Sequence, residues 1–158
     1  MRDSSSVDLL LLRHGIAAER LCGRDHPDRP LTDRGKRRTL EVVRQLRMLD
    51  VQADALISSP YRRSRQTAEL AVKAGLAESM RLDSALKPGG DPWPLVSRVS
   101  GCCLLVGHEP DLSILAATLI GAPAGSLRLR KAGYCHLSWP ADLSDPRGQA
   151  ELQALLRP

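Results

Sequence analysis

The stretch DLLLLRHGIAAER, residues 8–20, decides where the fold begins, because it changes character abruptly. Its four consecutive leucines form an apolar run without polar alternation, which is typical of a strand buried on both faces of a parallel sheet. An Arg-His-Gly triplet, residues 13–15, follows at once, and a polar loop rich in Asp, Pro and Gly continues to residue 30. The sequence therefore predicts a central strand over residues 7–12 that ends in a cation and a titratable imidazole.

The rest of the chain alternates between short apolar runs and helical patterns. Further strands are expected at residues 53–58, 80–83, 102–107, 127–129 and 134–139, and helices at residues 30–49, 59–74, 95–99, 111–120 and 149–156. Thr32 and Ser59 are suited to cap two of these helices, and Gly75 and Gly121 to end two. Alternating strands and helices indicate the α/β class. We expect a single three-layer α/β/α domain, residues 1–158, around a mainly parallel central sheet.

Composition narrows the class of partner. The net charge is +5, and nearly all of the 23 basic residues are arginines, whose planar forks suit phosphate or carboxylate. The chain has no Phe, two Trp and two Tyr, which leaves little for stacking on bases and disfavours nucleic acid as a partner. No apolar run is long enough to span a bilayer or to form the core of a secretory signal. We therefore expect a cytoplasmic protein without a membrane partner.

The four cysteines do not form a metal or disulfide pattern. None belongs to a C-x-x-C pair, and the adjacent Cys102 and Cys103 would point to opposite faces of a strand. Cys22 and His26 alone do not complete a metal site, and clustered carboxylates of the D-x-D kind are missing from the sequence. We expect reduced, mostly buried thiols and neither a metal nor another cofactor.

Three predicted strands end in cationic or titratable side chains. The sequences are RHG at residues 13–15, SSPYRRSRQT at residues 58–67 and VGHEP at residues 106–110. Each has a plain structural interpretation: a turn, a surface helix with solvated arginines, and a turn with a hydrogen-bonded histidine. Because the carboxyl ends of parallel strands meet at one edge of a sheet, where ligands bind, all three together indicate a functional site.

The combination resembles the histidine phosphatase superfamily, which is phosphoglycerate mutase-like in fold, and within it the small SixA-type protein-histidine phosphatases. The segments LLLLRHG, RPLTDRG, LISSPYRRSRQTAE, LKPGGDP and LLVGHEPDLS occur in the family's order and spacing and span most of the chain. The resemblance implies a mixed sheet flanked by helices. It also implies a metal-independent phosphatase that forms a covalent phosphohistidine.

The resemblance also implies a role for each of four residues. His14 would be the nucleophile, Arg13 and Arg63 would clamp the phosphoryl oxygens, and His108 would donate a hydrogen bond to one of them. Phosphoryl transfer needs such an aligned nucleophile among positive donors. The nearby arginines would lower the pKa of His14 and so favour the neutral, nucleophilic form of its imidazole.

The proton donor is left open by the sequence. Glu109, directly after His108, and Asp91 are both candidates, but Glu109 is equally suited to the N-terminus of the following helix. A site without a donor suits a P–N bond, because the leaving nitrogen can arrive already protonated.

The substrate expected is therefore phosphohistidine on a signalling protein. Alternatives are a broad-specificity phosphatase for small phosphomonoesters, and a non-catalytic module that binds a phosphorylated partner.

Overall fold

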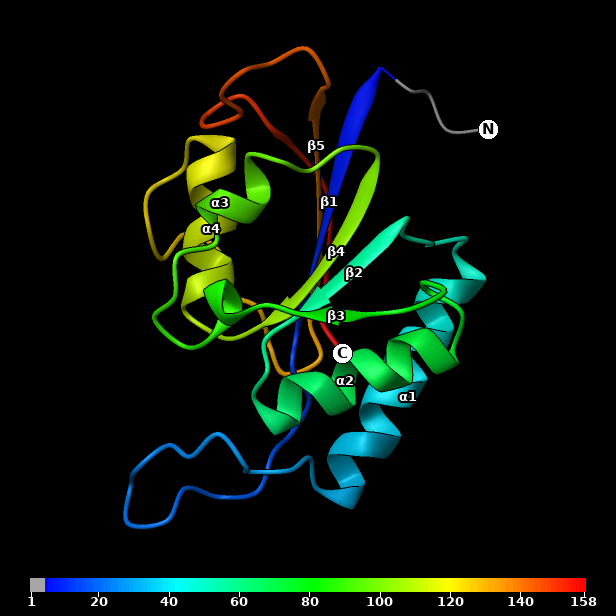
Figure 1. Cartoon of the computed structure of the whole chain (residues 1–158), viewed down its shortest axis with the longest axis vertical. Helices are drawn as coiled ribbons and strands as arrows, with labels where there is room; N and C mark the ends of the chain where they lie inside the picture. Colours follow the sequence, from blue (N-terminus) through cyan, green and yellow to red (C-terminus); the bar gives the residue numbers. More distant parts are fainter. Residues whose placement is uncertain (1–4) are drawn as a thin grey trace.

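The computed structural model describes residues 5–158, which form a six-stranded sheet with helices on both faces (Figure 1). In chain order the elements are β1 (Ser6–Arg13), α1 (Asp33–Met48), β2 (Ala55–Ser58), α2 (Arg62–Lys73), β3 (Arg81–Leu82), the 3₁₀ turn η1 (Ser84–Leu86), α3 (Trp93–Val96), β4 (Cys102–Gly107), α4 (Asp111–Ile120), β5 (Tyr134–Pro140) and β6 (Glu151–Leu156). Within this range, no helix has both the length and the apolar character that a bilayer-crossing segment requires.

The sheet is mixed, with its parallel part on one side. The strand order is β3-β2-β4-β1-β5-β6. The first four strands are parallel, whereas β5 and β6 pair antiparallel to their neighbours. Helices α1 and α2 cover one face and α3 and α4 the other (Figure 1). This arrangement confirms the three-layer α/β/α class and the mainly parallel sheet.

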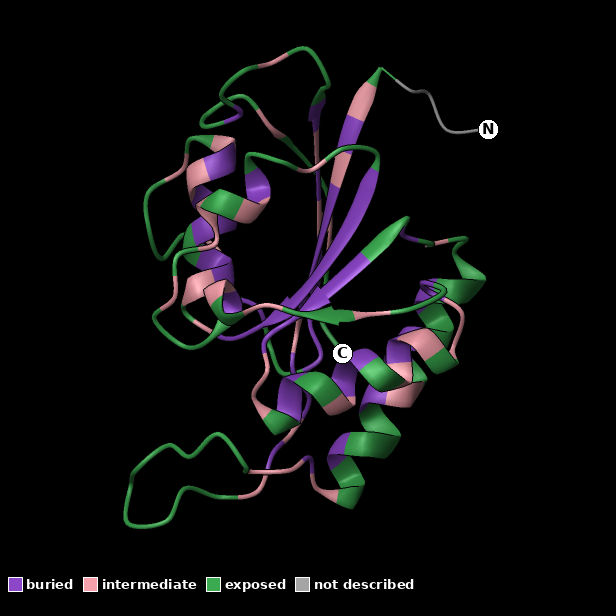
Figure 2. Ribbon diagram, in the orientation of Figure 1, coloured by how far each residue is buried: buried purple, intermediate pink, exposed green. Residues whose placement is uncertain are grey.

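Strands β1 and β4 form the buried centre of the sheet (Figure 2). Alternate side chains of β1 enter opposite layers: Leu9 and Leu11 pack with α4, and Leu10 and Leu12 pack with α1 and α2. A run of leucines without polar alternation is what two covered faces require. The central strand was therefore predictable from the leucine run alone.

The cysteines occupy the positions expected of unbridged thiols. Cys102 and Cys103 pack in opposite layers, Cys135 is buried, and Cys22 is exposed; none of the four forms a disulfide. Burial raises the pKa of the Cys103 thiol to about 11 and that of Cys135 to about 12. The thiols of Cys103 and Cys135 are therefore not nucleophiles at neutral pH.

Two of the predicted elements are wrong. Residues 149–156 were expected to form a helix but contain strand β6, which pairs with the otherwise open edge of β5. Residues 127–129 were expected to form a strand but remain a loop. In that loop the Leu129 amide donates to the Glu109 carboxylate and the Ser113 hydroxyl instead of to a neighbouring strand.

One of the two predicted helix caps is confirmed and the other is wrong. The Thr32 hydroxyl accepts a hydrogen bond from the Gly35 amide at 2.9 Å and caps α1. Helix α2 begins later than expected, with Tyr61 as N-cap, and the Ser59 hydroxyl is directed to other partners. The expected left-handed glycine at residue 121 ends α4.

Candidate active site

Strands β1 and β4 place the two predicted histidines side by side. Arg13 of β1 is in register with Gly107 of β4, so the residue after each strand leaves the sheet at the same level. The His14 amide donates to the Gly107 carbonyl at 3.1 Å, and the ring centroids of His14 and His108 lie 5.2 Å apart. Parallel pairing therefore joins two motifs that are more than ninety residues apart in the sequence.

Hydrogen bonds fix the tautomer of His14. Its Nδ1 lies 2.7 Å from the Gly15 carbonyl oxygen, which can only accept, so Nδ1 carries the proton. Its Nε2 receives the Arg63 Nε–H at 3.3 Å, and an arginine can only donate. Nε2 therefore holds a lone pair that faces a guanidinium group.

Arg63 comes from the first turn of α2 and is almost fully buried, at 2% exposure. Besides its contact with His14, its Nη1 donates to the His26 carbonyl at 3.3 Å and its Nη2 to Asp25 Oδ2 at 2.8 Å. Asp25 also receives the Nε–H of Arg29 at 2.9 Å. The acid thus holds two arginines at the mouth of the site.

His108 is held by hydroxyl groups of the β2–α2 segment. Its Nε2 lies 2.8 Å from Ser59 Oγ and 3.3 Å from Ser64 Oγ. Its Nδ1 is buried and makes no hydrogen bond with residues 5–158. If the two hydroxyls donate to Nε2, Nδ1 carries the proton and is left with a hydrogen bond to give.

The loop after β1 is tied to both helices of its layer. The Gly15 amide donates to Thr67 Oγ1 at 3.1 Å, and that hydroxyl donates to the Arg63 carbonyl at 2.8 Å. A Cβ at residue 15 would clash with Thr39 Oγ1 of α1. Close approach to α1, more than a special backbone angle, is thus what requires glycine next to His14.

The structure places the two proposed acids differently. Both carboxylate oxygens of Glu109 accept hydrogen bonds, one from the Ser113 amide and the other from the Ser113 hydroxyl and the Leu129 amide. Glu109 lines the same pocket as His14, but its carboxylate is bonded to the start of α4. Asp91 is exposed, accepts a bond from the Trp93 amide and does not line that pocket.

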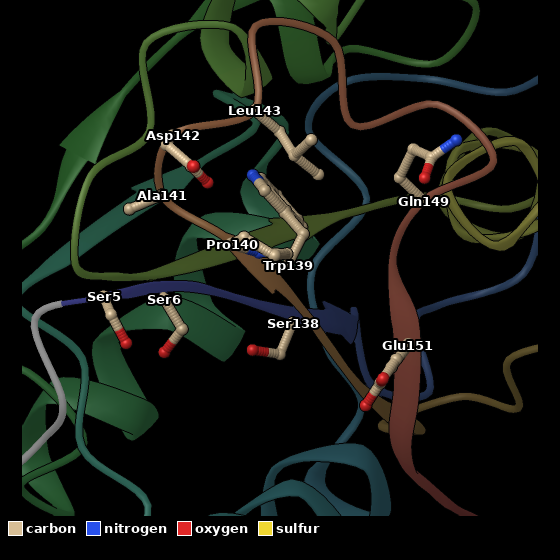
Figure 3. A pocket seen from close by; sticks show the side chains of 10 residues that line it. All are labelled: Ser5, Ser6, Ser138, Trp139, Pro140, Ala141, Asp142, Leu143, Gln149 and Glu151. Carbon is tan, nitrogen blue, oxygen red and sulfur yellow. The ribbon is translucent and has the colours of Figure 1, made fainter.

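All five predicted site residues line one cavity of about 170 Å³. The lining also includes residues that the sequence interpretation missed, namely Arg20, Asp25, Arg29 and Lys131. A larger hollow of about 700 Å³ lies at the other end of β1 (Figure 3), around Ser6 and Trp139. Among residues 5–158, no Arg, Lys or His lines that hollow, whereas a phosphoryl group needs cationic partners.

Burial controls the charge of both imidazoles. It lowers the pKa of His14 to about 3, with smaller contributions from His108, Arg63 and Arg13. Burial likewise lowers the pKa of His108 to about 3, and Arg63 and Arg13 contribute further. The expected effect of the arginines is therefore present, but desolvation is the larger cause. Both rings are neutral at neutral pH.

The buried imidazoles predict a loss of stability in acid. Above pH 6.5 they are neutral in the folded and the unfolded chain and do not alter the free energy of unfolding. Between pH 6.5 and about 3 the unfolded chain binds protons that the folded chain does not, so stability falls with pH. At pH 5 the loss is about 2 kcal/mol for each ring.

Urea unfolding at pH 7 and pH 5 measures this loss. In the variant His14→Gln/His108→Gln the fall between the two pH values should be smaller by about 4 kcal/mol, because glutamine does not titrate. An equal fall in the variant and in the wild type would show that other groups cause the acid instability.

Comparisons with known proteins agree with this geometry. The sequence model that describes the histidine phosphatase superfamily (branch 1) matches residues 9–87 of this chain. An uncharacterized protein of Picosynechococcus sp. is 35% identical over 141 residues, covering 83% of this chain and 84% of that protein. The structure of the protein histidine phosphatase SixA complexed with tungstate aligns with a TM-score of 0.78 and 22% identity, over 94% of this chain and 96% of that one.

A second solved structure carries the name phosphohistidine phosphatase SixA and comes from Nakamurella multipartitia. It also aligns with a TM-score of 0.78, with 27% identity over 97% of this chain and 96% of that one. Fold and relatives together define a phosphatase of the α/β class. The chain belongs to the histidine phosphatase superfamily, branch 1, and is of the SixA type in its architecture.

Proposed function

We propose that this chain is a metal-independent phosphatase that removes the phosphoryl group from phosphohistidine on a protein, through a covalent intermediate on His14. The observation that carries the proposal is the fixed tautomer of His14: Nδ1 donates to Gly15, and the Nε2 lone pair faces Arg63 inside the cavity. A neutral imidazole with a directed lone pair is the form that attacks phosphorus. Arg13, Arg63 and His108 supply donors for the phosphoryl oxygens.

The reaction has two displacements at phosphorus. In the first, the lone pair of His14 Nε2 forms a bond to phosphorus while the P–N bond of the substrate breaks. The substrate ring, which is protonated on its other nitrogen, leaves as neutral imidazole. In the second, a water oxygen bonds to phosphorus, the Nε2–P bond breaks, and dihydrogen phosphate leaves. Throughout, Nδ1–H stays bonded to Gly15, whose carbonyl stabilises the positive ring of the intermediate.

The surroundings of Glu109 support a P–N substrate over a P–O substrate. An ester oxygen needs a proton as it leaves, whereas a phosphohistidine ring that is protonated on its other nitrogen leaves as neutral imidazole. Both oxygens of Glu109 already accept hydrogen bonds from Ser113 and Leu129, so its carboxylate is held against the start of α4 and is not directed at a leaving group. The tungstate-bound SixA relative and the superfamily's name support the same class of reaction.

Substrate comparison tests the proposal. With excess chelator present, kcat/KM is measured on a phosphohistidine peptide and on a sugar phosphate monoester. We expect the peptide to be preferred by at least about 100-fold, because the site lacks a free acid for the ester. A preference for the ester, or loss of turnover with chelator, would refute the proposal.

The same reasoning predicts the behaviour of Glu109→Gln. The amide oxygen can still accept from Ser113, so the start of α4 is preserved. Turnover of phosphohistidine should change by less than about threefold, because no general acid has been removed. A loss of about 100-fold or more, which is what removal of a general acid costs, would instead identify Glu109 as the proton donor.

A further inference from the structure

A third hollow adjoins the cavity of about 170 Å³ around His14, called here the catalytic cavity, and is strongly basic. It has a volume of about 660 Å³ and is called here the basic pocket. Its lining consists of Arg13, Ile16, Arg34, Arg38, Arg130, Lys131, Arg157 and Pro158. Arg13 and Lys131 line the catalytic cavity as well, so the two hollows are neighbours. Of these eight residues, all within the described part of the chain, six are cations and none has an acidic side chain.

The cations of the basic pocket come from separate parts of the fold. Arg34 and Arg38 are four residues apart on α1 and therefore share one face of that helix. Arg130 and Lys131 precede β5, and Arg157 follows β6. Like charges at a spacing of four residues weaken a helix, so the fold gains nothing from this convergence.

The charge of the basic pocket is uncompensated in residues 5–158. No ion pair within that range involves Arg34, Arg38, Arg130, Lys131 or Arg157, whose side chains are all exposed. Exposed arginines elsewhere do find carboxylates, as Arg65 does with Glu69. Partial burial lowers the pKa of Lys131, and arginines that line the catalytic cavity, Arg13 among them, lower it further.

We propose that the basic pocket binds an acidic surface of the phosphoprotein substrate while the phosphohistidine enters the catalytic cavity; this inference rests on the proposed function. A cavity of about 170 Å³ holds little beyond the phosphoryl group, so the substrate residues around it must meet the adjoining surface. Carboxylates match the forked geometry of guanidinium groups. Nucleic acid fits less well, because no aromatic side chain lines the pocket for stacking.

Two phosphohistidine peptides of equal length test the proposal, one flanked by glutamates and one by lysines. For the wild type, kcat/KM at low salt should favour the acidic peptide by at least about tenfold, and added salt should reduce this ratio. Arg34→Glu/Arg38→Glu should bring the ratio to one or below, mainly through KM. The control Arg37→Glu/Arg44→Glu makes the same charge change on α1 outside the pocket and should keep the wild-type ratio.

Equal wild-type rates on the two peptides, or an unchanged ratio in Arg34→Glu/Arg38→Glu, would overturn the inference. If neither peptide is hydrolysed, the proposed function has failed. Binding of an acidic partner by the basic pocket is then tested separately, by fluorescence anisotropy with a glutamate-rich peptide that lacks phosphohistidine. Binding by the wild type that is lost in the double variant supports acidic-protein recognition, and absence of binding overturns it. Tighter binding of a single-stranded RNA of equal charge also overturns it, because the partner would then be nucleic acid.

Discussion

Replacement of His14 by alanine should lower kcat on phosphohistidine by about 10⁴-fold or more, the largest effect that any single exchange in this chain is expected to have. The reason is the position of His14 Nε2: its lone pair faces the guanidinium of Arg63 among the residues that line the cavity. His108 cannot substitute, because the hydroxyls of Ser59 and Ser64 occupy its Nε2. Loss of the proposed nucleophile should therefore leave a site that still binds phosphate but cannot form a covalent bond to the phosphoryl group.

Single-turnover kinetics and oxyanion binding separate chemistry from binding in this variant. The wild type should form a phosphoenzyme that His14→Ala does not form, while the variant still binds tungstate through its arginines. The matched control is His136→Ala, because His136 lies on β5 and pairs with Asp8 at 2.6 Å, away from the cavity. Turnover retained within about tenfold of the wild type in His14→Ala would remove this residue from the mechanism.

The parallel core of the fold was predictable because its signals are local. Four consecutive leucines indicate a strand with two covered faces, and Thr32 and Gly121 mark a helix start and a helix end by their own chemistry. The C-terminal segment was not predictable in this way. Its leucines, alanines and glutamines favour a helix, but the open edge of β5 pairs with it as a strand. Tertiary pairing outweighed intrinsic propensity there.

The residues of the candidate site were likewise predictable where the signal is local and missed where it depends on tertiary contacts. Arg13, His14, Arg63 and His108 were identified from three short motifs, and the structure brings all four to one cavity. Asp25 was missed because nothing in the loop sequence shows that it would reach an arginine 38 residues later.

The serines around His108 were missed for a similar reason. Ser59 was interpreted as a helix cap, which is what a serine before a proline usually indicates. Its contact with His108 exists only because β2 and β4 are neighbours in the sheet.

Arg63→Lys is expected to lower kcat/KM by about 10³-fold, although the charge is conserved. The guanidinium of Arg63 donates from three nitrogens in different directions, to His14, to the His26 carbonyl and to Asp25. A lysine ammonium is a single point that cannot reach all three, so the nucleophile loses its aligned donor and the phosphoryl oxygens lose a fork. Asp25 would also lose the hydrogen bond that Arg63 Nη2 donates to it.

Two neighbouring arginines of the same helix provide the control for this prediction. Arg62 and Arg65 are exposed on α2, do not line the cavity, and should tolerate lysine with less than about twofold change in kcat/KM. Tungstate affinity should fall in Arg63→Lys and stay constant in both controls, because Arg63 lines the cavity and the other two arginines do not. If Arg63→Lys kept wild-type kcat/KM, positive charge alone would suffice at this position, and the directed contacts of the guanidinium would have no part in the reaction.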